Sequence, residues 1–186
     1  MRSLSNSIWS LLFVAVIGCG TDDGGQTLAD GRTRVSLIDN LAWAPTADSD
    51  DPFWAEAAAN ADVCGFNVTE IEPEFSGIWF TVETSTCNYL TAQQPLTTAI
   101  PAGAEVEVRI WHFQITKGEG GYHLAITIGD DNVLAWDTQV PVPMTSALIK
   151  GQWIADRDYE AGERVLWHVS NHGVNSWSKV ELNATY

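Results

Sequence analysis

The chain has 186 residues, a length that suits a single domain with a sizeable core. Its formal net charge at pH 7 is −15, because 24 Asp and Glu residues face only 9 Lys and Arg residues. A surface this acidic repels phosphate backbones and anionic headgroups, which excludes nucleic acids as partners and electrostatic docking on membranes.

Residues 1–18 have the pattern of an export signal. Arg2 supplies positive charge, and residues 8–17 form an apolar run too short to span a bilayer as a stable helix. The stretch Val16-Ile17-Gly18-Cys19 resembles the lipobox of bacterial lipoproteins. This resemblance implies cleavage before Cys19 and attachment of a diacylglycerol to its thiol. The alternative is a plain secretory signal with an incidental cysteine.

The lipobox resemblance also implies a location, a lipid-anchored place in the bacterial cell envelope. Two or three acyl chains on Cys19 would anchor the protein stably in a membrane. Gly20 stands where retention signals tend to place Asp, which favours the outer membrane. Residues 19–34 are rich in Gly, Asp and Thr without hydrophobic periodicity, so we expect a flexible tether there.

The cysteine count agrees with export. With Cys19 committed to lipid, Cys64 and Cys87 remain as one pair, and an oxidising compartment favours a disulfide between them. The alternative, a pair of thiol ligands for a metal, lacks the close Cys-x-x-Cys spacing of common zinc sites.

From Val35 onward the hydrophobic pattern has a period of two, broken by turn residues. Residues 53–59 are the exception, since their Ala content and acidic start predict one short helix. Many short strands with almost no helix are typical of a β-sandwich or barrel, so we assign residues 35–186 to one all-β domain. The predicted strands are 35–43, 63–71, 77–85, 88–94, 104–116, 121–128, 133–137, 148–155, 163–170 and 176–183.

The expected strand 104–116 changes its pattern of apolar and polar residues partway along. Val106, Val108 and Ile110 alternate with charged residues, but from Trp111 onward apolar residues occupy the formerly polar side while His112 continues the apolar side. Either a bulge reverses the two faces or the strand is covered on both sides.

Several stretches resemble the jelly-roll carbohydrate-binding modules of the galactose-binding-like kind. Gln93-Gln94 and Leu96 are followed by the Pro101-Ala102-Gly103 turn and the alternating strand 106–111. The opening strand of such a module is similar to residues 35–43. Its second half is similar to a stretch that contains Trp153, the turn 159–162, and the strands 163–169 and 179–182. The resemblance implies a two-sheet β-sandwich of jelly-roll type with a glycan as its ligand.

The chain contains nine tryptophans, and flat aromatic faces stack on sugar rings while amides and carboxylates bond the hydroxyls. Most of these tryptophans sit in apolar strand contexts typical of a core. We select Trp79 and Trp136 as candidate platforms, with Asp137 beside the latter. Asn171 and Asn175, in a loop rich in turn residues, are further candidate ligand contacts.

All four histidines lie in the C-terminal half of the chain. Converging neutral imidazoles hold copper or zinc. The strand pattern makes His112, His168 and His172 the first candidates for such a site, with His123 as a fourth. The alternative is that each histidine is separately hydrogen-bonded within its strand or turn.

Two acidic groups are candidate calcium ligands, although neither follows an EF-hand loop. Solvated acidic loops are the alternative explanation for both. The first group is Asp48, Asp50 and Asp51, and the second is Asp156, Asp158 and Glu160.

Enzyme signatures are absent from the sequence, which contains no Gly-x-Ser-x-Gly elbow, phosphate-binding Gly loop or His-Glu-x-x-His motif. We therefore expect a binding protein rather than an enzyme: a membrane-anchored extracytoplasmic lipoprotein that binds a glycan. A copper- or zinc-binding lipoprotein is the alternative, and a structural envelope protein that assembles with partners is the third.

Overall fold

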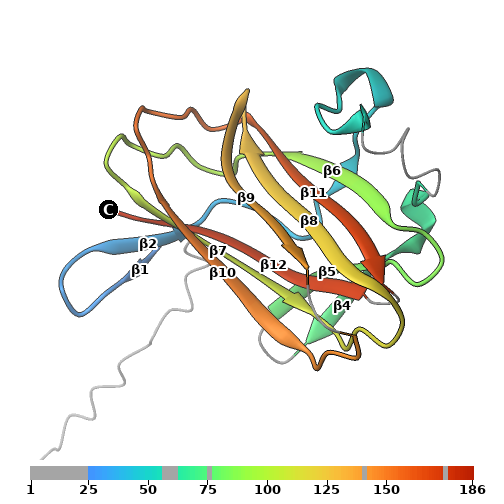
Figure 1. The fold of residues 1–186 in the computed structure, drawn as a ribbon. Helices are drawn as coiled ribbons and strands as arrows, with labels where there is room; N and C mark the ends of the chain where they lie inside the picture. The colour runs from blue at the N-terminus through green and yellow to red at the C-terminus, as the bar shows by residue number, and fades with distance from the viewer. Residues whose placement is uncertain (1–24, 56–62, 75–76, 140–141, 174–175) are drawn as a thin grey trace, which may run out of the picture.

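The computed structural model describes residues 25–55, 63–74, 77–139, 142–173 and 176–186, and they form an antiparallel sandwich of two sheets (Figure 1). The predicted all-β fold of jelly-roll type is confirmed. Within the described residues, helical structure is limited to two 3-10 turns, η1 (Asp48–Asp50) and η2 (Phe66–Val68), and to helical backbone at Trp54 and Ala55. The rest of the helix expected over 53–59 lies outside the described residues.

The smaller sheet has five strands in the order β3-β6-β11-β8-β9. Strand β11 is central and runs antiparallel to both β6 and β8. The β8–β9 hairpin forms one edge of this sheet. The strands are β3 (Ala44–Pro45), β6 (Tyr89–Pro95), β8 (Gly118–Ile128), β9 (Asp131–Gln139) and β11 (Arg164–Gly173).

The larger sheet has seven strands arranged around β12, which pairs with β7 along one side. On its other side, β12 pairs with β5 near its start and with β2 near its end. Strand β10 extends the sheet beyond β7 and forms its edge. The strands are β1 (Gln26–Thr27), β2 (Thr33–Ser36), β4 (Thr69–Glu74), β5 (Gly77–Glu83), β7 (Glu105–His112), β10 (Ala147–Ile154) and β12 (Ser176–Thr185).

The core lies between the sheets and is built from the alternating apolar residues of both. On β7 the alternation continues unbroken to His112, which is buried beside Tyr122 and Trp177. The bulge falls on the partner strand instead, where β12 uses one more residue than β7 between Ser178 and Glu181. The faces of β7 therefore do not reverse at Trp111, which is half-buried on the outer side.

The folded body begins within the stretch that was expected to be a tether. Strands β1 and β2 form a hairpin whose turn contains Gly31 at a φ of 85°. Asp30 accepts hydrogen bonds from the backbone and side chain of Arg32, which fixes this turn. An ion pair of 3.0 Å between Arg34 and Glu107 ties the hairpin to the outer face of the larger sheet. The sequence did not indicate this hairpin because its two strands are too short to show alternation of apolar and polar residues.

The predicted disulfide between Cys64 and Cys87 is confirmed. It joins the chain entering η2 and β4 to the connection before β6. Next to it, the backbone N–H of Cys64 donates to the carbonyl of Tyr89 at 2.7 Å. The bridge therefore fixes a long connection against the start of the smaller sheet.

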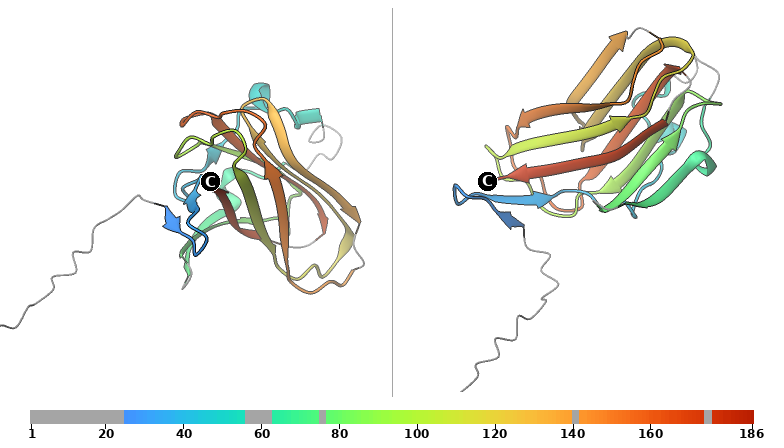
Figure 2. Two further views of the ribbon diagram at one scale, coloured as in Figure 1. Left: turned by 90° about the vertical axis from the view of Figure 1, so that its left-hand side faces the viewer. Right: turned by 90° about the horizontal axis from the view of Figure 1, so that it is seen from below.

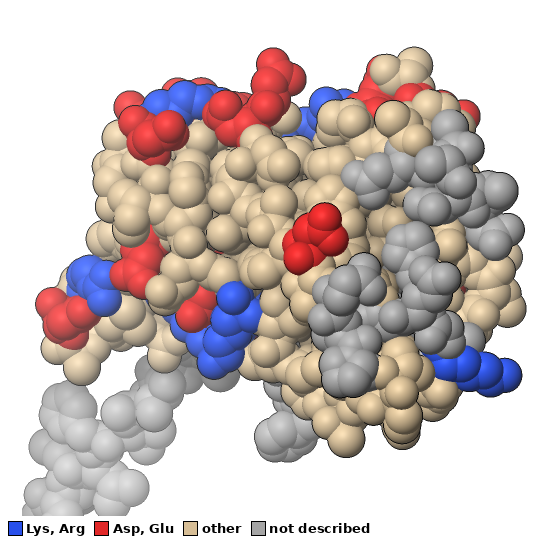
Figure 3. Space-filling model, in the orientation of Figure 1, with Lys and Arg blue, Asp and Glu red and all other residues tan. Residues whose placement is uncertain are grey.

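The edge strands β9 and β10 lie side by side where the two sheets meet at the front of Figure 1. The indole of Trp136 from β9 packs over Gly151 of β10, where an added Cβ would lie only 2.4 Å from the ring. Figure 3 shows that the middle of this face is largely uncharged and that charged side chains gather mainly toward its edges. The view from below in Figure 2 shows β10, β7 and β12 of the larger sheet side by side. Trp136 thus fills the space between the edge strands β9 and β10 of the two sheets, which we call the seam.

Candidate functional site

The outer face of the smaller sheet is unusual because it is buried at its centre. On β11, Trp167 and Val169 point into the core, so His168 and Ser170 must point the other way. Both are nevertheless fully buried. Another part of the chain therefore covers this face.

The cover is the crossing segment, residues 48–55. The carboxylate of Asp51 accepts a hydrogen bond of 2.5 Å from the Tyr89 hydroxyl and one of 2.9 Å from the backbone N–H of Phe53. The Phe53 ring stacks on the imidazole of His168, with centroids 4.2 Å apart and an interplanar angle of 15°. These contacts fix the crossing segment on strands β6 and β11.

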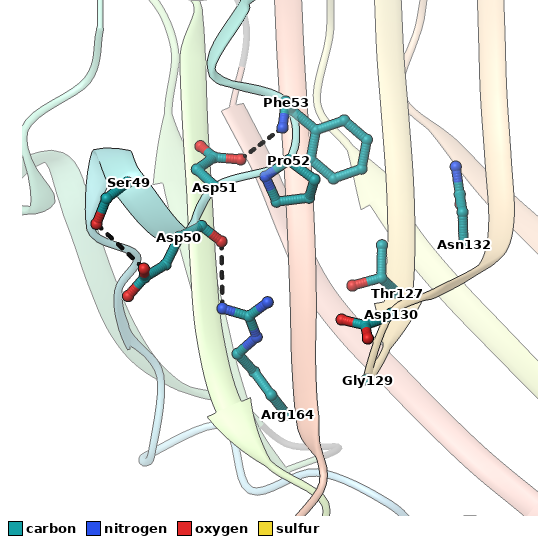
Figure 4. A pocket seen from close by; sticks show the side chains of 10 residues that line it. All are labelled: Ser49, Asp50, Asp51, Pro52, Phe53, Thr127, Gly129, Asp130, Asn132 and Arg164. Carbon is teal, nitrogen blue, oxygen red and sulfur yellow. Dashed lines mark hydrogen bonds between the residues drawn. The ribbon is translucent and has the colours of Figure 1, made fainter.

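Beyond the crossing segment, the face opens into a hollow of about 420 Å³ beside the β8–β9 turn. We call it the β8–β9 hollow. Three segments far apart in the sequence converge on it: the crossing segment, the β8–β9 hairpin and the start of β11 (Figure 4). Its lining consists of Ser49, Asp50, Asp51, Pro52, Phe53, Thr127, Gly129, Asp130, Asn132 and Arg164.

The lining combines an apolar wall with hydrogen-bonding groups of both kinds. Pro52 and the half-buried ring of Phe53 supply the apolar wall. Arg164 is a donor, and its Nη1 also bonds the backbone carbonyl of Asp50 at 3.2 Å. Asp130 and Asn132 are exposed, so their side chains are accessible to a ligand. Such a lining suits a small polyhydroxylated molecule with one apolar face.

An ionic cluster supports the β8–β9 turn next to the hollow. Arg157 pairs with Asp131 at 3.0 Å and with Glu163 at 3.2 Å, and its guanidinium lies 3.8 Å from the centre of the Tyr159 ring. These hydrogen bonds from Arg157 hold the pKa of the Glu163 carboxyl below its usual range. Burial, with the neighbouring Asp131, raises the pKa of Tyr159. The turn that carries Asp130 is therefore held by charge pairing.

The structure does not bring the sequence-predicted ligand residues together. Trp79 is half-buried on the outer side of β5 in the larger sheet, whereas Trp136 packs toward the core in the seam. Asp137 is exposed on β9, paired in register with His123 of β8. Asn171 lies in β11, where the structure does not describe its side chain, and Asn175 lies outside the described residues.

The histidines divide between two layers. His112 lies in the core, and its Nδ1 donates to the Phe113 carbonyl at 2.7 Å. His123 and His168 lie on the outer face of the smaller sheet with ring centroids 5.1 Å apart, and His168 Nδ1 bonds the Thr91 hydroxyl at 3.0 Å. The side chain of His172 is not among those described. Across the described residues, no three His, Cys, Asp or Glu side chains are placed to hold a metal ion.

The two acidic groups make contacts within the protein. Asp158 accepts a hydrogen bond of 2.7 Å from the backbone N–H of Ala102, and Asp156 accepts one of 3.3 Å from the Tyr159 hydroxyl. In the first group, Asp50 accepts a hydrogen bond from the Ser49 hydroxyl. Asp51 holds the crossing segment by accepting hydrogen bonds from the Tyr89 hydroxyl and the Phe53 backbone. The first group thus helps to form the hollow, a role that spacing alone did not indicate.

Several hollow residues were not selected from the sequence. Phe53 was assigned to the predicted helix, and Thr127 to a strand. The sequence signals that could have indicated the site are the polar run Gly129-Asp130-Asp131-Asn132 between two strands and the cationic Arg164 at a strand start. Neither signal indicates that the crossing segment lies across the same face.

No protein-family model matches the sequence, and no curated protein matches it. Within the part of the chain that is described, no helix is long and apolar enough to cross a membrane.

Several solved structures are similar in fold, and some of them are carbohydrate-binding modules. One is the C-terminal CBM6 of the Zobellia galactanivorans laminarinase LamC (TM-score 0.42, 9% identity, 83% of this chain and 98% of that one). Another is TmCBM61 in complex with β-1,4-galactotriose (0.41, 11%, 81% and 97%). A third is the K1 adhesin domain of Lys-gingipain from Porphyromonas gingivalis (0.39, 8%, 83% and 97%). At these TM-scores and identities, the likenesses carry no inference about the ligand of this chain.

Proposed function

We propose that the protein is a glycan-binding lipoprotein of the bacterial cell envelope and that the β8–β9 hollow is its sugar site. The observation that carries this proposal is the convergence of three distant segments on one hollow with an apolar wall and polar groups. The apolar face of a sugar ring would pack against Pro52 and Phe53. Its hydroxyls would bond Asp130, Asn132 and Arg164, which provide both acceptors and donors.

The test is the double variant Asp130→Ala/Asn132→Ala in a glycan-binding assay with the full chain. Both side chains are exposed and line the hollow. Because each loses ligand hydrogen bonds, we expect affinity to fall about tenfold or more. The unfolding midpoint should stay within about 2 °C, since exposed substitutions change stability little. Isothermal titration calorimetry and thermal unfolding measure the two effects.

The matched control is Glu160→Ala, an exposed acidic residue in the neighbouring loop that does not line the hollow. Its affinity should equal that of the unmodified protein. If the double variant binds as tightly as the control, the hollow is not the sugar site. Trp79→Ala in the same assay then tests the candidate platform on the larger sheet.

The lipid anchor is the second part of the proposal, and it rests on the lipobox-like stretch ending at Cys19. Produced in a bacterial host, the full chain should partition into the detergent phase of a Triton X-114 extract, because its acyl chains bury many methylene groups. The Cys19→Ala variant should move to the aqueous phase, whereas Gly20→Ala should not. Equal partitioning of the unmodified chain and Cys19→Ala would refute the anchor.

A further inference from the structure

The lining residues of the β8–β9 hollow stand on opposite sides of it (Figure 4). In Figure 4 the crossing segment lies above and to the left, and the β8–β9 hairpin lies below and to the right. Around the space stand, in order, Pro52 and Phe53, Asp50 and Arg164, Gly129 and Asp130, and Asn132. A ligand in the hollow would therefore contact all three segments.

Thr127 provides an independent sign that the hollow receives a ligand. It lines the hollow from β8 and is only 4% exposed. Its Oγ1 is buried and has no hydrogen-bond partner among the described residues. Buried hydroxyls are nearly always paired. A ligand hydroxyl would satisfy this group, since each hydroxyl both donates and accepts.

The charges around the hollow select against acidic ligands. Asp50, Asp51 and Asp130 contribute three carboxylates, whereas Arg164 is the cation among the lining residues. Part of the Arg164 guanidinium is already engaged by the backbone of Asp50. The whole chain adds a net charge of −15, so the field around the hollow repels anions at longer range as well.

We infer that the β8–β9 hollow binds a sugar unit of a neutral saccharide through Thr127 and rejects uronic acid and sulfated glycans. This inference rests on the proposed glycan-binding function and adds the charge class of the ligand and the way it is held. In this arrangement the bound sugar packs against Phe53 and one of its hydroxyls bonds Thr127.

The first experiment titrates the full chain with galactose, β-1,4-galactotriose, xylobiose, xylohexaose and cellohexaose, and with galacturonic acid as the charged counterpart of galactose. The uronate should bind at least about tenfold more weakly than its neutral counterpart. Equal binding of the uronate would overturn the inference while the proposed function stands. If no saccharide binds, the proposed function itself fails.

The second experiment uses Thr127→Val, which replaces the hydroxyl by a methyl group of similar shape. Affinity for the bound saccharide should fall about three- to tenfold, as for the loss of one hydrogen bond. The unfolding midpoint should not fall, because the hydroxyl has no partner among the described residues in the unliganded protein. Thr127→Ser keeps the hydroxyl and should retain affinity within about twofold. Unchanged affinity in Thr127→Val would overturn the role of Thr127.

Discussion

Replacing Trp167 by alanine should lower the free energy of unfolding by about 3–5 kcal/mol, a large share of the stability of a typical domain. Trp167 is fully buried on the central strand β11. Its ring packs against Phe80 from the other sheet at 5.6 Å and against Trp43 at 6.2 Å between centroids. Alanine would leave a cavity where the two layers meet. Urea denaturation followed by far-UV circular dichroism measures this loss.

Trp167→Phe is the control that separates the aromatic packing from the indole N–H. The Nε1 of Trp167 is buried without a hydrogen-bond partner among the described residues, so removing it costs no bond to the described part of the protein. We expect this variant to lose less than about 1.5 kcal/mol, as for a core substitution that keeps most of the volume. A similar loss in both variants would show that ring packing is not the main contribution of Trp167.

Removing the disulfide with Cys64→Ala/Cys87→Ala should lower the free energy of unfolding by about 3 kcal/mol. The two cysteines are 23 residues apart, and the bridge restricts the unfolded chain over that loop. Because Asp51 and Phe53 hold the crossing segment by contacts of their own, glycan affinity should remain within about twofold. Denaturation and titration calorimetry on the same preparation give both values.

Reduction of the unmodified protein is the control for the cysteine variant. With a thiol reductant, its unfolding midpoint should fall to that of Cys64→Ala/Cys87→Ala, and the reductant should not affect the variant. A variant as stable as the oxidised protein would contradict the expected stabilisation by the bridge. A loss of affinity larger than tenfold would show that the crossing segment depends on the disulfide.

Strands are the part of the fold that the sequence predicted well. Alternation of apolar and polar residues identifies a strand and its two faces locally, as in the stretch from Val106 to Ile110. The hairpin at residues 26–36 escaped prediction because β1 and β2 span only two and four residues. The sequence left open whether a bulge reverses the faces near Trp111, and the structure places the bulge on β12, since only the pairing of two strands shows which one carries the extra residue.

The candidate site depended far more on the tertiary structure. Local alternation places His168 and Trp167 on opposite faces of one strand, but it does not tell which face is the core or what covers the other. The structure puts Phe53 over His168 and leaves His112 in the core, which separates histidines that the sequence grouped together. The two tryptophans selected as platforms, Trp79 and Trp136, likewise belong to different sheets.

The sequence by itself determined the all-β class, most strand positions and the cysteine pair, because these follow from short-range periodicity and from residue counts. Its lipobox-like stretch and acidic charge also defined the expected compartment and the partners to exclude. Only the tertiary structure brings the residues of the proposed site together. The β8–β9 hollow joins residues 49–53, 127–132 and 164, and these meet only because the crossing segment returns over a sheet built from strands much later in the chain.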